Sequence, residues 1–157
     1  VNDILEFSNS ETDSNKLSKD EVNIKSEIDA HIKSIDMNLK SRGLSVKVTG
    51  EAVKTLDRKL WNQAINNLID NAVIYCSDKS TIDINIAGNG LTVSNKVDND
   101  ISDAERLKEP FVKGDSARGE NSGSGLGLAI ANNNLNRLGY KLSISCENKT
   151  FVAKVSK

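Results

Sequence analysis

The residues with the clearest chemical potential are three carboxamide side chains, Gln63, Asn67 and Asn71, each four positions from the next. Side chains at this spacing lie above one another on one face of an α-helix, so their amide groups can converge on one bound object. Mg²⁺ commonly takes one or two protein oxygens while water and substrate phosphates complete its coordination. Asn67 and Asn71 are therefore candidate Mg²⁺ ligands. The alternative is that these amides only cap neighbouring loops.

A glycine run is the second candidate feature: Gly123, Gly125 and Gly127 alternate with other residues, including Leu126 and Leu128, at the start of an expected helix. Such glycines leave backbone N–H groups unobstructed and the helix dipole adds positive potential, so the run can bind phosphate. The spacing differs from that of a dinucleotide-binding turn, and no Lys-Ser or Lys-Thr pair follows as in a P-loop. Alone, the run is equally consistent with a flexible helix entrance.

Between these two features lies a segment, residues 96–122, with little hydrophobic periodicity and one apolar island at 107–112. Long segments without secondary structure inside a compact domain are commonly lids or binding loops. Phe111 would anchor such a lid, and Arg118 could bind phosphate oxygens through two hydrogen bonds. Lys113 is a second cation for this purpose, or a solvated side chain of an exposed loop.

The elements that position these residues follow from hydrophobic spacing. A broad apolar stripe predicts a core-facing helix over residues 57–75, which carries the amide row on its flank. The pair Ser26 and Asp29 has a capping pattern and predicts a helix from there to a stop at residues 42–43. A third helix is expected over 123–138. Alternating apolar residues predict strands near 22–24, 44–48, 82–86, 91–93, 141–146 and 150–155.

This order of elements predicts an α+β domain, a two-layer α/β sandwich with three main helices on one face of a mixed, mostly antiparallel sheet. The length of 157 residues suits one such domain. Residues 1–7 have helical apolar spacing and residues 8–17 have linker composition. We therefore expect a helix tail and hinge over 1–17 and the domain over 18–157. The first residue, Val1, suggests a piece of a longer protein.

Composition excludes several classes of function. The formal net charge is −1 and basic residues are scattered, which argues against a nucleic-acid partner. No apolar run approaches the ~20 residues of a membrane-spanning helix. Cys76 and Cys146 lie in apolar surroundings without metal-binding spacing, so we expect two buried thiols in a reducing compartment.

Three segments, NNLIDNAVIYC, EPFVKGDSAR and GSGLGLAIA, resemble in this order the N box, F box and G2 box of the catalytic ATP-binding domain of two-component sensor histidine kinases. That domain belongs to a larger group that includes gyrase-type ATPases. The resemblance extends from residue 20 to the end of the chain. It implies a Bergerat fold with ATP and Mg²⁺ between the N-box helix and an ATP lid. It further implies transfer of the γ-phosphoryl group to a histidine on an upstream dimerisation domain, for relay to a response regulator.

The resemblance also assigns residue roles. Asn67 and Asn71 would bind Mg²⁺ and phosphate, Asn67 and Arg118 would serve catalysis, and Tyr75 would lie beside the base. The other implied nucleotide contacts are Phe111, Lys113, Arg118, Gly123, Gly125, Leu126, Gly127 and Leu128. Hydrolytic relatives place a water-activating glutamate near the position of Asn67. Asparagine is a poor base, which favours transfer to histidine over hydrolysis.

Three positions depart from the family pattern. Asn95 stands where the G1 box has an aspartate that accepts a hydrogen bond from the adenine amino group; its side-chain oxygen could accept that bond without the charge. Ile74 replaces a lysine that many relatives carry near the phosphates. His31, the only histidine, lacks the acidic neighbour and later proline of a phosphoacceptor, and we expect a surface or half-buried side chain.

The implied parent protein is a homodimeric, membrane-anchored sensor kinase, of which this chain would be a cytoplasmic, monomeric fragment without the phosphoacceptor histidine. Two alternatives stay open. One is a catalytically weak nucleotide-binding or scaffolding module that lost transfer through the changes at Asn95 and Ile74. The other is a related protein-serine kinase, against which the helical spacing of residues 1–7 argues.

Overall fold

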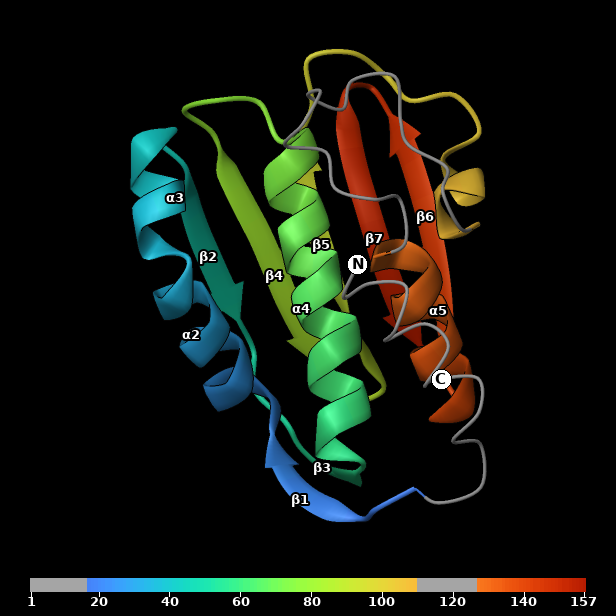
Figure 1. The fold of residues 1–157 in the computed structure, drawn as a ribbon. Helices are drawn as coiled ribbons and strands as arrows, with labels where there is room; N and C mark the ends of the chain where they lie inside the picture. Colours follow the sequence, from blue (N-terminus) through green and yellow to red (C-terminus); the bar gives the residue numbers. More distant parts are fainter. Residues whose placement is uncertain (1–16, 110–126) are drawn as a thin grey trace.

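The computed structural model describes residues 17–109 and 127–157 (Figure 1). The helix tail expected before residue 8 and most of the hinge lie outside the described residues. So do six of the expected nucleotide contacts: Phe111, Lys113, Arg118, Gly123, Gly125 and Leu126.

The main sheet has five strands in the order β2-β4-β5-β7-β6. Their bounds are β2 Ser45–Thr49, β4 Thr81–Ala87, β5 Gly90–Lys96, β6 Lys141–Glu147 and β7 Thr150–Ser156. Strand β2 runs parallel to β4, and the other three neighbouring pairs are antiparallel. The predicted mixed, mostly antiparallel sheet is therefore confirmed.

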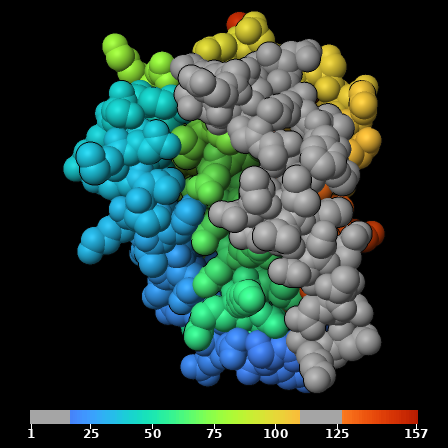
Figure 2. Space-filling model, in the orientation of Figure 1, coloured from blue at the N-terminus to red at the C-terminus, as the bar shows by residue number. Residues whose placement is uncertain are grey.

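The helices cover one face of this sheet, as Figure 1 shows. They are α2 Ile24–Ser34, α3 Asp36–Ser41, α4 Arg58–Tyr75 and α5 Gly127–Arg137, with a 3-10 helix, η1 Ala104–Lys108, beside β6. In the space-filling view the atoms of α2 lie directly beside those of α4 (Figure 2). The two-layer α/β sandwich predicted from the order of elements is confirmed.

The first helix differs from its prediction in two ways. Its cap is Asn23, whose side-chain oxygen accepts the Ser26 N–H at 3.1 Å, so Ser26 lies inside the helix and Ile24 begins it instead of ending a strand. Asparagine is among the best N-cap residues, and the capped turn buries Ile24 completely. The helix is also broken at Ile35, whose φ of −107° and ψ of 14° separate α2 from α3.

A second, two-stranded sheet pairs β1 Asp20–Asn23 with β3 Val53–Leu56. It delivers the chain to the start of α4, where Asp57 is the N-cap and accepts the Leu60 N–H at 3.0 Å. Asp20 accepts the N–H of Arg58, the first helical residue, at 3.1 Å. Two carboxylates thus occupy the positive end of the central helix, where they stabilise it.

The core lies between the helices and the main sheet. On β4 the side chains of Ile82, Ile84 and Ile86 are buried while their neighbours are exposed, as their alternation predicts. The buried face of α4 packs against this sheet and α5, and its buried residues are Trp61, Ala64, Ile65, Leu68, Ile69, Ala72, Val73 and Tyr75.

Part of the segment expected to lack structure is ordered as η1. Its Ala104 and Leu107 are buried. Glu105 accepts the Ile144 N–H at 2.5 Å, and Lys108 donates to the Leu142 carbonyl at 3.0 Å, so η1 covers the outer edge of β6. Hydrophobic spacing did not predict η1, because one short 3-10 helix does not repeat often enough to give a periodic pattern in the sequence.

The two cysteines are both free thiols. Cys76 is buried as expected, and burial raises the pKa of its thiol. Cys146 is only partly buried, so the prediction of two buried thiols is wrong at this position. Cys146 is on the outer strand β6, where it lies beside Asp100 and Ile101.

Candidate functional site

The site is organised around α4, on which Asn67 and Asn71 occupy one edge of the buried face. The Nδ2 atoms of both side chains are buried and have no hydrogen-bond partner among residues 17–109 and 127–157. A buried amide group without a partner costs roughly 1–3 kcal/mol. Such groups in a folded domain call for an explanation, and a ligand that supplies the missing partners is one.

Gly127, the first residue of α5, lies beside Asn67. A Cβ atom built on Gly127 would be 3.7 Å from Oδ1 and 3.8 Å from Cγ of Asn67. Gly127, the last of the expected phosphate-binding glycines, is therefore next to Asn67, the first of the two expected metal ligands. Leu128 is a buried core residue, so any contact it makes with a nucleotide would come from its backbone.

Gln63, the first member of the amide row, has a structural role. Its Oε1 accepts a hydrogen bond of 2.7 Å from Nδ2 of Asn134 on α5, and the same amide donates to the Leu60 carbonyl at 3.2 Å. Asn134 is completely buried, so it joins α4 to α5 inside the core. Sequence spacing alone did not separate Gln63 from Asn67 and Asn71, because the partner is 71 positions away.

Asn95 lies on β5 and is only 3% exposed. Its Nδ2 donates to the Lys96 carbonyl at 3.2 Å. Its Oδ1 is buried without a hydrogen-bond partner within the described part of the chain. Because the nitrogen already has a partner, the group left for a ligand is an acceptor, which suits an exocyclic amino group.

Tyr75, in the last turn of α4, shares a neighbour with Asn95. The Tyr75 ring stacks on Phe151 with centroids 5.6 Å apart and planes at 17°. Phe151 on β7 is directly opposite Asn95 on β5, so the two side chains are on the same face of the sheet. Tyr75 and Asn95 are thereby brought to one region, although they belong to different elements.

Ile74 and His31 are the other two positions that depart from the pattern of the resembling family. Ile74 is partly buried and packs against the core, so it provides no substitute for the lysine that many members of the resembling family carry. His31 is half-buried, as expected; its Nε2 lies 2.7 Å from Oδ1 of Asp70, and its side chain is 15% exposed. This contact joins α2 to α4. Asp70 is next to Asn71 in the sequence, but its carboxylate is directed to His31 on α2.

Within residues 17–109 and 127–157 there is no group of three or more His, Cys, Asp or Glu side chains that could hold a metal ion. A divalent cation here would need amide oxygens together with oxygens of its ligand. Mg²⁺ bound to a nucleotide matches this description, because it retains few protein ligands and several phosphate or water oxygens.

The two-layer sandwich thus combines buried amides on its central helix with a glycine, Gly127, at the start of α5 beside Asn67, and these are groups that a nucleotide site can use. The family model described as "Histidine kinase-, DNA gyrase B-, and HSP90-like ATPase" matches residues 56–157. The chain belongs to this family.

Individual proteins agree with this assignment. The chain is 36% identical over 92 residues to the sensor histidine kinase ArsS of Helicobacter pylori, a match that covers 59% of this chain and 21% of that protein. The chain thus corresponds to about a fifth of that relative's length.

Two solved structures show the same fold. One is full-length ShkA in complex with AMPPNP, with a TM-score of 0.79 and 19% identity over 99% of this chain and 35% of that one. The other is the catalytic domain of the histidine kinase ThkA, with a TM-score of 0.70 and 19% identity over 89% of this chain and 96% of that one. No helix in the described part of this chain is long and apolar enough to cross a membrane.

Proposed function

We propose that this chain is the catalytic ATP-binding domain of a sensor histidine kinase and transfers the γ-phosphoryl group of Mg-ATP to a histidine on an upstream dimerisation domain. The observation that carries the proposal is the set of buried, unpartnered amide atoms on Asn67, Asn71 and Asn95. They are distributed along α4 and β5, as a ligand with a phosphate end and a base end would require. The family membership supports this interpretation.

At the phosphate end, Asn67 and Asn71 would hold Mg²⁺ and phosphate oxygens. A carboxamide suits this role because it presents one oxygen for the metal and an NH₂ group for a phosphate oxygen. Bound Mg²⁺ would neutralise negative charge on the phosphates. The N–H groups of the glycine run, ending at Gly127 beside Asn67, would hold the phosphates from the other side.

At the base end, the Oδ1 of Asn95 would accept a hydrogen bond from the amino group of adenine. Phe151, directly opposite Asn95, and the Tyr75 ring stacked on Phe151 would supply apolar surroundings for this acceptor. Guanine presents a carbonyl oxygen where adenine presents its amino group. An acceptor fixed opposite that position therefore favours ATP over GTP.

Phosphoryl transfer requires positioning and charge neutralisation more than a strong base. Asn67 cannot remove a proton from water, so the bound triphosphate would persist until an acceptor histidine arrives. Arg118 of the lid would stabilise charge on the transferred group, as the resemblance implies. We propose further that residues 1–17 connect this domain to the dimerisation helices of a homodimeric, membrane-anchored parent with its catalytic part in the cytoplasm. A response regulator would then receive the phosphoryl group.

Titration calorimetry with ATP in the presence and absence of Mg²⁺ tests the binding step. Wild-type protein should bind Mg-ATP, and Asn71→Ala should weaken binding at least tenfold, which corresponds to about 1.4 kcal/mol. Asn38→Ala, an exposed asparagine on α3, is the matched control and should bind like wild type. The proposal fails if wild-type protein binds no nucleotide, or if Asn71→Ala binds as tightly as the control.

A second candidate keeps the nucleotide site and removes the transfer reaction. It is favoured by one observation, the core packing of Ile74 where other members offer a cation. Incubation with γ-labelled ATP and a dimerisation domain that contains a phosphoacceptor histidine distinguishes the two candidates. Label on the histidine supports the kinase. Tight Mg-ATP binding without any label supports the binding module.

A further inference from the structure

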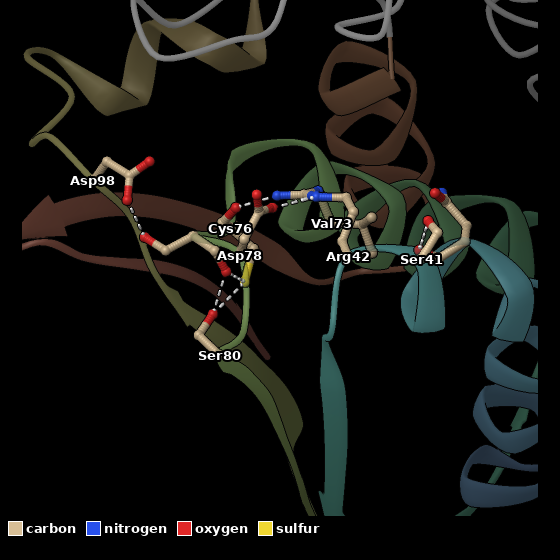
Figure 3. A network of polar contacts seen from close by, with 9 residues as sticks. Ser41, Arg42, Val73, Cys76, Asp78, Ser80 and Asp98 are labelled. Carbon is tan, nitrogen blue, oxygen red and sulfur yellow. Dashed lines mark hydrogen bonds and ion pairs between the residues drawn. The ribbon is translucent and has the colours of Figure 1, made fainter.

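Arg42, the C-cap residue of α3, reaches across to the C-terminal end of α4 (Figure 3). Its Nη1 donates to the Val73 carbonyl and its Nη2 to the Cys76 carbonyl. Its Nε donates to Oδ1 of Asp78 at 2.8 Å. One guanidinium group therefore binds two backbone carbonyls and one carboxylate, and its side chain is only 18% exposed.

The carbonyls that Arg42 binds are at the end of α4, where the last turn lacks intrahelical donors. This end also carries the negative pole of the helix dipole, so a cation stabilises it. An arginine can bind both carbonyls at once because its donors form a rigid planar fork. The Arg42 backbone is held too, because its carbonyl accepts the Lys79 N–H at 3.0 Å.

The turn that Arg42 holds is connected to the base end of the proposed site. It contains Tyr75, which stacks on Phe151. Ser77, just beyond it, donates its N–H to the Lys96 carbonyl at 2.8 Å and its hydroxyl to Asp98 at 2.7 Å. Lys96 follows Asn95, so these bonds fix the end of α4 against the end of β5.

We propose that Arg42 is a positioning residue for nucleotide binding. By fixing the last turn of α4, it determines where the groups at the base end of the site lie. The inference rests on the proposed function. Arg42 acts through Tyr75 and through the Ser77 contacts that adjoin Asn95. Asn67 lies beside Gly127, about two helical turns before Tyr75. Buried residues of α4 hold the helix in place there without Arg42. Loss of Arg42 should therefore affect base recognition more than phosphate binding.

The experiment measures the Kd of Mg-ATP and of Mg-GTP by calorimetry for wild type, Arg42→Gln, Arg42→Lys and Lys40→Gln. Arg42→Gln should weaken ATP binding about tenfold and GTP binding less than about threefold, so the preference for ATP narrows. Arg42→Lys keeps a donor and the charge without the fork, and should recover part of the preference. Lys40→Gln removes an exposed cation of α3 that pairs with Asp36, and should match wild type.

Equal weakening of ATP and GTP binding by Arg42→Gln would overturn the inference, since it would show only a general loss of stability. An unchanged preference for ATP, or the same change in Lys40→Gln, would also overturn it. If Arg42→Gln does not fold, Asp78→Asn tests the same contact in a milder form and should narrow the preference about twofold. If wild-type protein binds neither nucleotide, the proposed function itself is wrong.

Discussion

Gly127 at the start of α5 lies next to the side chain of Asn67 in the middle of α4, so that a Cβ at Gly127 would be in van der Waals contact with Asn67, 3.7 Å from its Oδ1. This proximity joins two motifs that are 60 positions apart in the sequence. It places a helix start, whose first N–H groups have no partner within the helix and which carries the positive end of the dipole, beside an amide that can bind a metal or phosphate. The proposed triphosphate site is therefore the junction of two helices.

The first prediction concerns the space at Gly127. An alanine there would make ordinary van der Waals contact with Asn67, so Gly127→Ala should fold and gain roughly 0.5 kcal/mol from the reduced freedom of the unfolded chain. Gly127→Val adds two methyl groups beyond a Cβ that is already in contact with Asn67, so it should displace that side chain and weaken Mg-ATP binding. Urea denaturation and calorimetry measure the two effects. Gly88→Val, at a position with nothing within 4 Å, should leave affinity unchanged.

The second prediction concerns the buried contact between α4 and α5. Asn134→Ala removes two hydrogen bonds and leaves the Leu60 carbonyl and Gln63 without this partner, so the free energy of unfolding should fall by about 1–3 kcal/mol. Asn136→Ala, exposed on the same helix, is the control and should have little effect. Equal midpoints of denaturation for both variants would show that the Asn134 contact contributes nothing.

The third prediction separates binding from stability at Asn95. Asn95→Leu replaces a buried acceptor that lacks a partner within the described chain, so the nucleotide-free protein should be at least as stable as wild type. The Lys96 carbonyl keeps the Ser77 N–H as donor, which limits the cost of losing Nδ2. The preference for ATP over GTP should disappear. A large loss of stability together with a retained preference would show that Asn95 is a structural residue.

The fourth prediction concerns pH and the η1 contact with β6. Burial raises the pKa of the Glu105 carboxyl, but the hydrogen bonds from Lys108 and from the Ile144 N–H together outweigh it, and the pKa falls below its ordinary value of 4.5. A lowered folded-state pKa means that the carboxylate stabilises the fold above pH 4.5, and that this stabilisation is lost as pH falls through the folded-state value.

Glu105→Gln should therefore be less stable than wild type at pH 7, and the difference should shrink on acidification below pH 4.5. Chemical denaturation at several pH values measures it. Glu109→Gln, whose exposed side chain pairs with Arg106 on the surface, is the control and should lose less stability at pH 7 than Glu105→Gln. A pH-independent difference for Glu105→Gln would contradict the explanation.

Local pattern predicted the helix α4, the alternating strands and the sandwich because these depend on spacing within one element. The same local reasoning was wrong about Ile24, which begins a helix instead of ending a strand, and about the helix break at Ile35. At each place the choice between helix and another conformation depends on a single residue, which hydrophobic spacing does not resolve. It also missed η1, whose buried Ala104 and Leu107 are stabilised by contact with a strand far along the chain.

In the candidate site, too, some features follow from local spacing and others from tertiary packing. The sequence by itself determined that Asn67 and Asn71 share one face of a helix, because a four-residue interval is one helical turn. Only the tertiary structure decided that Gln63 would bond to Asn134, that Gly127 would meet Asn67, and that Arg42 would hold the end of α4. Those contacts join residues that are tens of positions apart, and such pairs are selected by how elements pack, which no local interval specifies.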